Sequence, residues 1–408
     1  MTTVNETSSD IDRYTDAMAE LVVRFGANVQ PGQVVAIGCE PGKEQMVRAI
    51  AEHAYRAGAK FVDLSVFDPY LKRARALYGE REDLGYVPPW LGQRVLALGD
   101  LHAARISLSG PSAPHALDDV DPELIGLDML PRLAESMTVV NDQTTNWSIV
   151  PGPTEAWASL VHPELEPAAA LQRLWADVAH VCRLDEPDPI GAWRTRLSAL
   201  RRVAAALTEQ RFDAIRLHGP GTDLTVGLFA SSHWIAADER TVGGIEHRPN
   251  LPTEEVFTTP DPERVDGTVT ATKPLFTSGT TITGLRVGFE RGRVVSIEAD
   301  EGADVLRGLV AHDDGAARLG ELALVDGQGR IGPLDTVFYD TLLDENAASH
   351  IALGAGYQVG VTDEADRARV NLSQIHVDFM IGSSEISIDG LRAGGEAVPV
   401  MRDHRWQL

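Results

Sequence analysis

Cysteine, positive charge and long apolar runs are all scarce in this chain of 408 residues. Its two cysteines, Cys39 and Cys182, lie far apart in sequence, which argues against a disulfide framework and fits a reducing compartment. Lys and Arg total 36 against 60 Asp and Glu, and the net charge of −24 indicates that neither nucleic acid nor an anionic membrane is a partner. No run approaches the ~20 apolar residues of a membrane span, and the polar, acidic first residues do not have the pattern of a signal peptide. We therefore expect a cytoplasmic protein.

The composition, 43% hydrophobic and 24% charged, is that of a folded globular protein, and the length suggests two or three domains. In residues 1–185 helix and strand patterns alternate. A helix is expected from a cap at Ser9 or Asp10 to Gly26, and further elements are expected at 34–38, 44–58, 60–68 and 104–110. Strands separated by helices favour a parallel sheet covered on both faces. We therefore predict an α/β N-terminal domain at 1–185.

The pattern changes between residues 185 and 210. Two helices, near 166–184 and 188–208, lead into a region rich in Thr, Val and Gly with strand–turn–strand signals, including 212–229 and 268–299. A single short helical stretch, 301–311, interrupts it. Residues 186–408 are therefore predicted to form an α+β domain rich in antiparallel strands.

Two common catalytic motifs are missing. The stretch GCEPGKE (38–44) follows a predicted strand, but it has three residues between its glycines where a phosphate-binding loop has four, and Glu44 where Ser or Thr would hold magnesium. No G-x-S-x-G nucleophile elbow occurs. The stretch 38–44 is interpreted as an ordinary strand-to-helix turn.

His376 and Asp378 stand two apart in the apolar run SQIHVDFMIG. Residues i and i+2 of a strand share a face, so the two side chains should project together. Burying a charge there is costly unless it is paired or coordinated. A histidine and a carboxylate are ligands typical of zinc, cobalt or manganese, but one such pair alone favours a structural His–Asp hydrogen bond.

Other carboxylate, histidine and tyrosine side chains that could bind a metal or act in catalysis occur in apolar runs or turns of the same domain. Glu254 and Glu255 precede the β-prone run Val256–Thr259, and Glu321 stands at the head of an apolar strand. Glu345, His350 and Tyr357 follow within one segment, and a turn must separate Glu345 from His350 if they are to converge, because five residues span about 140° of a helix. Several candidate ligands in one domain favour a metal site over isolated structural pairs.

The stretches NLPTEEVFTTP (250–260), LGE (319–321), ENAASHIALG (345–354) followed by Tyr357, and HVDFMIG (376–382) occur in this order. Together they resemble the M29 family of metallo-aminopeptidases. The resemblance implies metal ligands at Glu255, Glu321, His350, His376 and Asp378, with Glu345 as a sixth, and Tyr357 as the catalytic tyrosine. Ser349 stands where relatives often carry cysteine, but the position is not a ligand. The resemblance also implies a homodimer.

Three or more carboxylates with two histidines exceed what one tetrahedral zinc needs and suit two divalent ions, Zn, Co or Mn, that activate a shared water. Tyr357 would donate a hydrogen bond to the oxyanion of the tetrahedral intermediate. Glu254, on the opposite side of an extended backbone, is a catalytic-base candidate or a support for the ligands, unless it is only salt-bridged. The implied activity is release of N-terminal amino acids from peptide substrates. The sequence leaves open which ligand serves which ion.

Two other functions remain open from the sequence. His350, His376 and Asp378 alone would form the two-histidine, one-carboxylate triad of a mononuclear non-haem iron dioxygenase that cleaves rings. Such a triad needs neither Glu255 nor Glu321, so their presence favours the hydrolase. A non-catalytic binding protein on a peptidase scaffold is the second alternative, and the full ligand set with Tyr357 argues against it.

Overall fold

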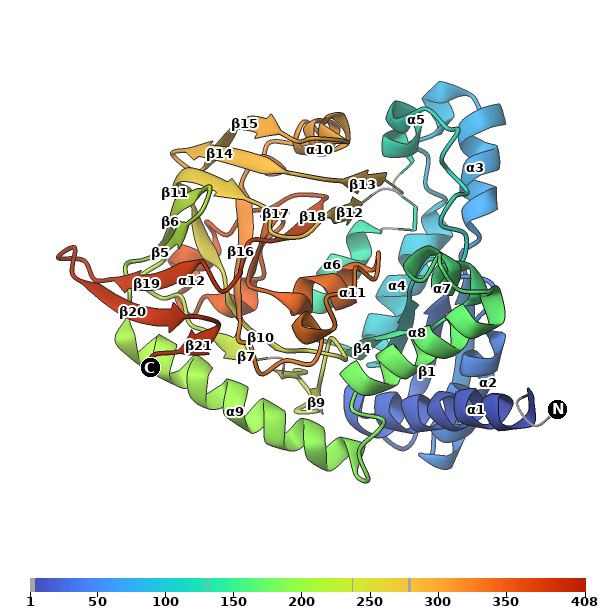
Figure 1. The fold of residues 1–408 in the computed structure, drawn as a ribbon. Helices are drawn as coiled ribbons and strands as arrows, with labels where there is room; N and C mark the ends of the chain where they lie inside the picture. Colours follow the sequence, from blue (N-terminus) through green and yellow to red (C-terminus); the bar gives the residue numbers. More distant parts are fainter. Residues whose placement is uncertain (1–3, 129, 132, 237, 278–279) are drawn as a thin grey trace. The chain divides into compact units, whose positions relative to one another are not determined.

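The computed structural model describes residues 4–128, 130–131, 133–236, 238–277 and 280–408, and the chain forms two compact units (Figure 1). The first unit comprises the residues up to Thr195 together with two later segments, Ala237–Thr253 and Phe338–Leu342. The second unit comprises Arg196–Ala236, Glu254–Val337 and Leu343–Leu408. The candidate ligands lie in the second unit.

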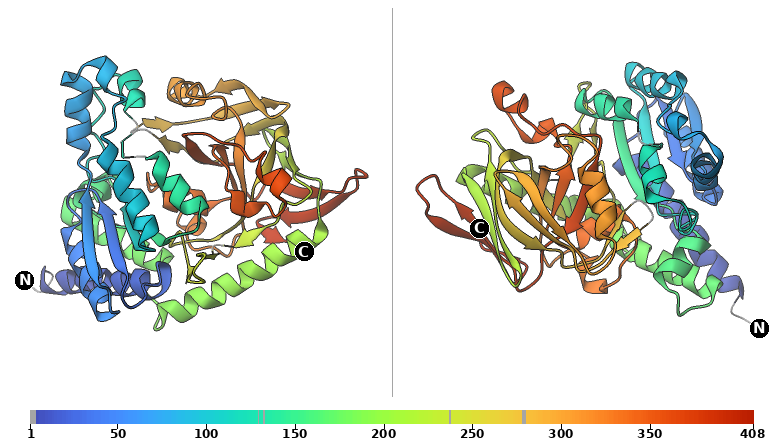
Figure 2. Two further views of the ribbon diagram at one scale, coloured as in Figure 1. Left: turned by 180° about the vertical axis from the view of Figure 1, so that it is seen from behind. Right: turned by 90° about the horizontal axis from the view of Figure 1, so that it is seen from above.

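The first unit contains a four-stranded parallel sheet of order β2-β1-β3-β4. Its strands are β1 (Val34–Cys39), β2 (Phe61–Val66), β3 (Ala104–Ser109) and β4 (Asn146–Pro151). The chain steps from β1 to β2 in one direction and then crosses β1 to reach β3, so right-handed crossovers place the connecting helices on opposite faces (Figure 2). The predicted α/β architecture is confirmed, although β4 was not predicted from the sequence.

The sequence predicted three helices of the first unit, up to Gly26, at 44–58 and near 166–184, and the helices between residues 69 and 161 were not predicted. The helices of this unit are α1 (Val4–Leu21), α2 (Glu44–Arg56), α3 (Pro69–Tyr78), α4 (Pro89–Asp100), α5 (Pro122–Leu127), α6 (Ala134–Asn141), α7 (Glu155–Val161) and α8 (Pro167–Val181), and α9 (Pro189–Gln210) follows. The predicted cap at Ser9 or Asp10 is wrong, because α1 already begins at Val4. Ser, Thr and Asp cost little within the first turns of a helix, so the polar stretch before Ile11 does not mark its start. A π-helical turn, Val22–Gly26, then ends the helix at the predicted glycine.

The larger sheet of the second unit has eight strands in the order β15-β14-β11-β6-β5-β19-β20-β21, and its neighbouring strands are antiparallel. Its strands are β5 (Ala214–Gly219), β6 (Thr222–Leu228), β11 (Pro260–Thr270), β14 (Arg286–Glu290), β15 (Arg293–Glu298), β19 (Ser387–Leu391), β20 (Ala397–Arg402) and β21 (Arg405–Trp406). A two-stranded ribbon of the second unit is formed by β12 (Leu275–Thr277) and β13 (Thr280–Ile282), and a ribbon of the first unit is formed by β8 (Glu239–Arg240) and β9 (Glu246–His247). The predicted helix near 301–311 is α10 (Ala303–Val310), and two short segments, α11 (Thr341–Asp344) and α12 (Glu364–Arg367), complete the α-helices of the described residues.

A second, five-stranded antiparallel sheet of this unit carries the candidate ligands. Its order is β18-β17-β16-β10-β7, from β7 (Ile235–Ala236), β10 (Glu255–Thr258), β16 (Leu319–Val325), β17 (His350–Gly354) and β18 (His376–Met380). Every residue of β16 and β17 is buried, and β11 of the larger sheet lies against β16. Two packed antiparallel sheets confirm the predicted class of this region.

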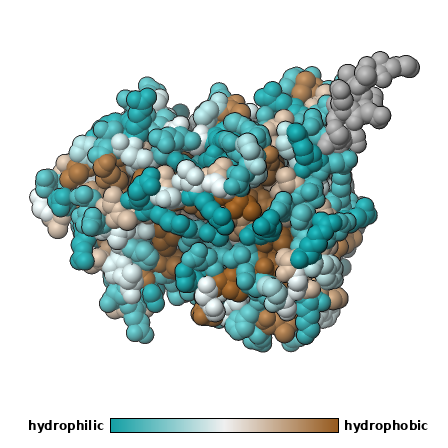
Figure 3. Space-filling view, turned by 90° about the horizontal axis from the view of Figure 1, so that it is seen from below, coloured by the Kyte–Doolittle hydropathy of each residue, from teal (hydrophilic) through white to brown (hydrophobic). Residues whose placement is uncertain are grey.

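The face seen in Figure 3 is mainly hydrophilic, with apolar residues in small groups. This agrees with a chain in which about a quarter of all residues are charged. Among the described residues, no helix combines the length and the apolar composition needed to cross a membrane.

Candidate metal centre

Four neighbouring strands project the candidate ligands from one face of the five-stranded sheet. Asp378 of β18 pairs with Ala352 of β17, which pairs with Glu321 of β16, so these three residues form one row across the sheet. Directly opposed residues point to the same side, and residues two apart along a strand share it. His350 and His376, each two residues from a member of this row, therefore lie on the same face. The small Ala352 leaves space between the longer side chains.

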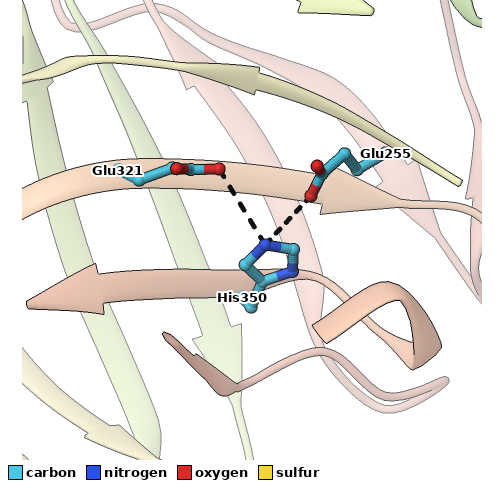
Figure 4. A group of neighbouring side chains, drawn as sticks. All are labelled: Glu255, Glu321 and His350. Carbon is cyan, nitrogen blue, oxygen red and sulfur yellow. Dashed lines mark ion pairs between the residues drawn. The ribbon is translucent and has the colours of Figure 1, made fainter. Parts of the chain in front are cut away.

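Each histidine is oriented by a backbone carbonyl. Nδ1 of His350 donates to Ala348 O at 3.1 Å, and Nδ1 of His376 donates to Ala355 O at 2.8 Å. A carbonyl oxygen can only accept, so Nδ1 carries the proton in both rings. In both residues Nε2 is thereby directed at carboxylates, as Figure 4 shows for His350.

Glu321 lies between the two histidines and uses one oxygen for each. Its Oε1 is 4.0 Å from His350 Nε2, and its Oε2 is 3.5 Å from His376 Nε2. Glu255 Oε2 is 3.0 Å from His350 Nε2, and Asp378 Oδ1 is 3.3 Å from His376 Nε2. The side chains thus form two groups, Glu255–Glu321–His350 and Glu321–His376–Asp378, in each of which the ligand atoms lie within 4.8 Å of one another. Glu321 belongs to both.

The carboxylates raise the pKa values of both histidines. Burial alone would lower the pKa of His350, but the hydrogen bond and charge of Glu255, with the charges of Asp378 and Glu345, raise it to about 10. Burial likewise opposes a charge on His376, whereas Asp378, Tyr357 and Glu321 raise its pKa well above the usual range. The carboxylates outnumber the histidines, so even two protonated imidazoles do not balance their charge.

Glu345 lies in the turn that the spacing required. It begins a 3₁₀ turn, Glu345–Ala347, after which Ala348 is extended and leads into β17. Burial, followed by the charges of Asp378 and Glu255, raises the pKa of Glu345 well above its usual value. Glu345 is therefore close enough to the ligands to feel their charge, although it belongs to neither of the two groups.

Tyr357 lies beside His376, with ring centroids 5.2 Å apart, and meets Phe257 edge-on at 6.0 Å. Gly354, at φ 104°, ends β17 and allows the chain to turn. Thr259 Oγ1 donates to Tyr357 O at 2.6 Å. The charge of His376 lowers the pKa of Tyr357, but burial and the carboxylates outweigh it and raise that pKa. The phenol is therefore neutral at pH 7 and able to donate a hydrogen bond.

Comparison with known proteins decides the family. The family model for the thermophilic metalloprotease (M29) matches residues 11–406. The chain belongs to the M29 family of metalloproteases. It is 41% identical to aminopeptidase T of Thermus thermophilus, with 97% of this chain and 98% of that protein covered, and 36% identical to aminopeptidase 2 of Geobacillus stearothermophilus, with 99% of each covered. The solved structure of wild-type AmpT from Thermus thermophilus matches 97% of this chain and 99% of its own, with a TM-score of 0.88. The predicted family, fold and enzyme class, a metallo-aminopeptidase of the M29 type, are confirmed.

An M29 metalloprotease implies divalent metal ions, and the side chains fit them. Oε2 of Glu255 is buried, and the described residues offer it no donor other than Nε2 of His350, 3.0 Å away. An imidazole that binds a metal ion through Nε2 no longer donates there, so this buried carboxylate oxygen then needs a cation to balance it. The two Nε2 atoms oriented by backbone carbonyls and the surrounding carboxylates are ligand types that zinc, cobalt and manganese accept.

Glu254 has an environment different from that of Glu255. Its side chain is fully buried, and Oε2 accepts a hydrogen bond from Arg196 Nε at 2.5 Å. A salt bridge was one of the roles expected for Glu254, but its partner was not predicted from the sequence. A signal existed: Arg196 shares the helical stripe of Trp193, Leu197 and Leu200, all fully buried, where an arginine needs a buried acceptor.

Proposed function

We propose that the chain is a metal-dependent aminopeptidase in which two divalent ions are held side by side and share Glu321. The observation that carries this proposal is the division of Glu321 between two groups of ligands, one oxygen toward His350 and the other toward His376. Glu255 and His350 complete the first site, and His376 and Asp378 complete the second. Glu345 is proposed as a further ligand, because it is buried among the same charges.

When bound, such ions polarise a peptide carbonyl and lower the pKa of a water molecule at the site. The chain's own residues prepare the geometry for this chemistry. The two imidazoles are held by backbone carbonyls, so their Nε2 atoms do not have to reorganise when they bind. Tyr357, neutral and beside His376, donates a hydrogen bond to the carbonyl oxygen as negative charge develops on it.

The preference for peptide N-termini follows from the same excess of negative charge. A free α-amino group is a cation or, when deprotonated, a ligand, and a site lined by buried carboxylates favours it over an internal amide. The relatives from Thermus thermophilus and Geobacillus stearothermophilus are aminopeptidases. They lend no support to the ring-cleaving dioxygenase alternative, whose triad would leave Glu255 and Glu321 without a role.

Replacement of His376 by alanine tests the ligand assignment, because it removes one nitrogen from the second site. We expect the purified variant to bind one metal ion per chain where the parent binds two, and to lose hydrolysis of leucyl-p-nitroanilide by roughly 10³-fold or more. His312→Ala, at an exposed histidine, is the control and should retain both ions and full activity. Two tightly bound ions in the His376→Ala variant would show that the ligand assignment is wrong.

We also propose a cytoplasmic homodimer, as the family resemblance and the two cysteines predict. Light scattering at micromolar concentration tests the oligomeric state, with a mass of twice 44.1 kDa expected. A monomer mass would remove the dimer from the proposal without affecting the metal site.

A further inference from the structure

Behind the metal-binding face, a buried arginine connects two of the strands that carry ligands. The guanidinium of Arg196 on α9 is 8% exposed and lies between Glu254 and Asp326, both fully or almost fully buried. Nε donates to Glu254 Oε2 at 2.5 Å, and Nη2 and Nη1 donate to the two oxygens of Asp326 at 2.8 and 3.3 Å. Paired charges in a fork geometry of this kind have little freedom to move.

The two acidic partners of Arg196 are next in sequence to the ends of two strands that carry ligands. Glu254 immediately precedes β10, whose first residue is the ligand Glu255, and Asp326 immediately follows β16, which carries the ligand Glu321. Glu255 and Val325 form the terminal pair between these strands. Arg196 therefore links Glu254, the residue before Glu255, to Asp326, the residue after Val325. It also contacts the backbone, because Nη2 donates to Glu254 O at 3.3 Å.

The side chains of Asn346 and Trp406 also hold Glu254 and Asp326 in place. Asn346, which is fully buried and follows Glu345, accepts a hydrogen bond from Glu254 N at 2.7 Å. Asp326 accepts from Trp406 Nε1 at 2.6 Å and from Gln328 N at 3.0 Å. Both the amide and the carbonyl of Glu254 are thus engaged by buried side chains, and the direction of the next residue, Glu255, is determined by them.

We infer that Arg196, with Glu254, Asp326 and Asn346, is a positioning network that sets the affinity of the Glu255–Glu321–His350 group for its metal ion. The inference rests on the proposed two-metal site. Among the described contacts, the network meets the site next to Glu255 and at Glu345, which accepts from Asn346 Nδ2 at 3.4 Å. The partners described for His376 and Asp378 do not include its members, so the Glu321–His376–Asp378 group should not depend on it.

The experiment is a Zn²⁺ titration of the metal-free protein by calorimetry, with parent and variants compared. Glu255→Gln and Asp378→Asn assign the two binding steps, because each removes a ligand that belongs to only one group. Arg196→Lys keeps the positive charge but replaces the planar fork of the guanidinium with a single ammonium, which cannot reproduce the paired geometry on both carboxylates. We expect the step assigned to Glu255 to weaken ~10–100-fold, the range known for residues that orient metal ligands, and the other step to stay within about threefold.

Arg402→Lys is the matched control. Arg402 also donates to a carboxylate, that of Asp389, and to two backbone carbonyls, but it does so in β19 and β20 of the larger sheet. This variant should leave both binding steps unchanged. If Arg196→Lys does not fold, Glu254→Gln keeps the side-chain volume and the Arg196–Asp326 pair, and it should weaken the Glu255 step several-fold.

The outcomes separate the inference from the function on which it rests. A parent protein that binds no Zn²⁺, or one ion only, would refute the two-metal proposal itself. A parent with two steps, both unchanged in Arg196→Lys, or both weakened equally, would overturn the positioning role and leave the two-metal proposal intact.

Discussion

The two units each contain a buried cluster of charged side chains, and the two clusters are completed in different ways. In the first unit, the ammonium of Lys43 donates to three backbone carbonyls, those of Leu108, Ser109 and Gly110, at 2.6–3.1 Å. Asp340 accepts from Ser109 Oγ and Gly110 N, so the chain itself supplies these partners. In the second unit, the ligand cluster (Glu255, Glu321, Glu345, His350, His376 and Asp378) has more carboxylates than histidines, and the carboxylates raise the pKa values of both histidines.

The comparison shows that burial of charge alone does not identify a site. Burial lowers the pKa of Lys43, and the charges of Glu40 and Asp340 oppose the shift, yet the group is saturated with acceptors. In the ligand cluster the carboxylates outnumber the histidines, and divalent ions would balance their excess negative charge. We therefore expect changes in the ligand cluster to affect metal binding and rate, and changes in the Lys43 cluster to affect stability.

The largest effect on this comparison is expected for Tyr357→Phe, in the ligand cluster. The variant keeps the ring contacts with His376 and Phe257 and removes one hydroxyl, so stability and metal content should not change. The hydrogen bond to the developing oxyanion is lost, so kcat should fall ~10²–10³-fold with little change in KM. Steady-state kinetics on a short peptide measure this. Tyr78→Phe, at a tyrosine that is 83% exposed, is the control. Activity of Tyr357→Phe within about threefold of the parent would contradict a catalytic role.

The sequence could predict those parts of the ligand cluster that depend on residues close together in the chain, but not those that depend on residues far apart. His376 and Asp378 were predicted to share a face from alternation alone, and they lie 3.3 Å apart. The turn between Glu345 and His350 also followed from local spacing. The pairing of Glu321 with Ala352, and the strand order β18-β17-β16-β10, are non-local, so the motifs indicated which residues converge and not how Glu321 is shared.

The same limit applies to the fold. The elements of the parallel sheet were recognisable from short apolar runs, except β4. No local pattern indicates that Phe338–Leu342 belongs to the first unit, since that depends on contacts such as Asp340 with Gly110, 230 residues apart. Arg196 escaped recognition for the same reason, because its acceptors lie 58 and 130 residues away.

A smaller effect, on stability only, is expected for Lys43→Met. Methionine preserves the length of the side chain but leaves three carbonyls of the first unit without their donor, which should lower the free energy of unfolding by about 2 kcal/mol. Urea denaturation measures the change, with Lys60→Met at an exposed lysine as the control. Metal content and kcat should equal those of the parent. If Lys43→Met kept the parental stability but bound less metal, the Lys43 cluster would serve metal binding and not stability, contrary to this prediction.

The smallest effect, on unfolding free energy, is expected for Asp313→Asn, which compares two kinds of carboxylate within the second unit. Asp313, like Lys43, is satisfied by the chain: Oδ1 accepts from Gly315 N and Ala316 N, and Oδ2 accepts from Ser373 Oγ and Gln374 N. Burial alone would raise the pKa of Asp313, but these hydrogen bonds together outweigh it and lower that pKa below its usual value of 3.8. Asparagine can accept with one oxygen only, so Asp313→Asn should lose about 1 kcal/mol of unfolding free energy at pH 7.

The pH dependence of that loss distinguishes a saturated carboxylate from a ligand. Because the folded pKa of Asp313 lies below the unfolded one, its ionised form stabilises the fold above pH 3.8, and the stabilisation disappears as the pH falls through the folded pKa. The difference in unfolding free energy between parent and Asp313→Asn should therefore be constant from pH 7 to about pH 5 and shrink below about pH 4. Asp314→Asn, at the exposed neighbour, should show no difference at any pH. If the loss instead depended on added metal and not on pH, Asp313 would take part in metal binding. The interpretation of Asp313 as a carboxylate satisfied by the chain's own hydrogen bonds would then be wrong.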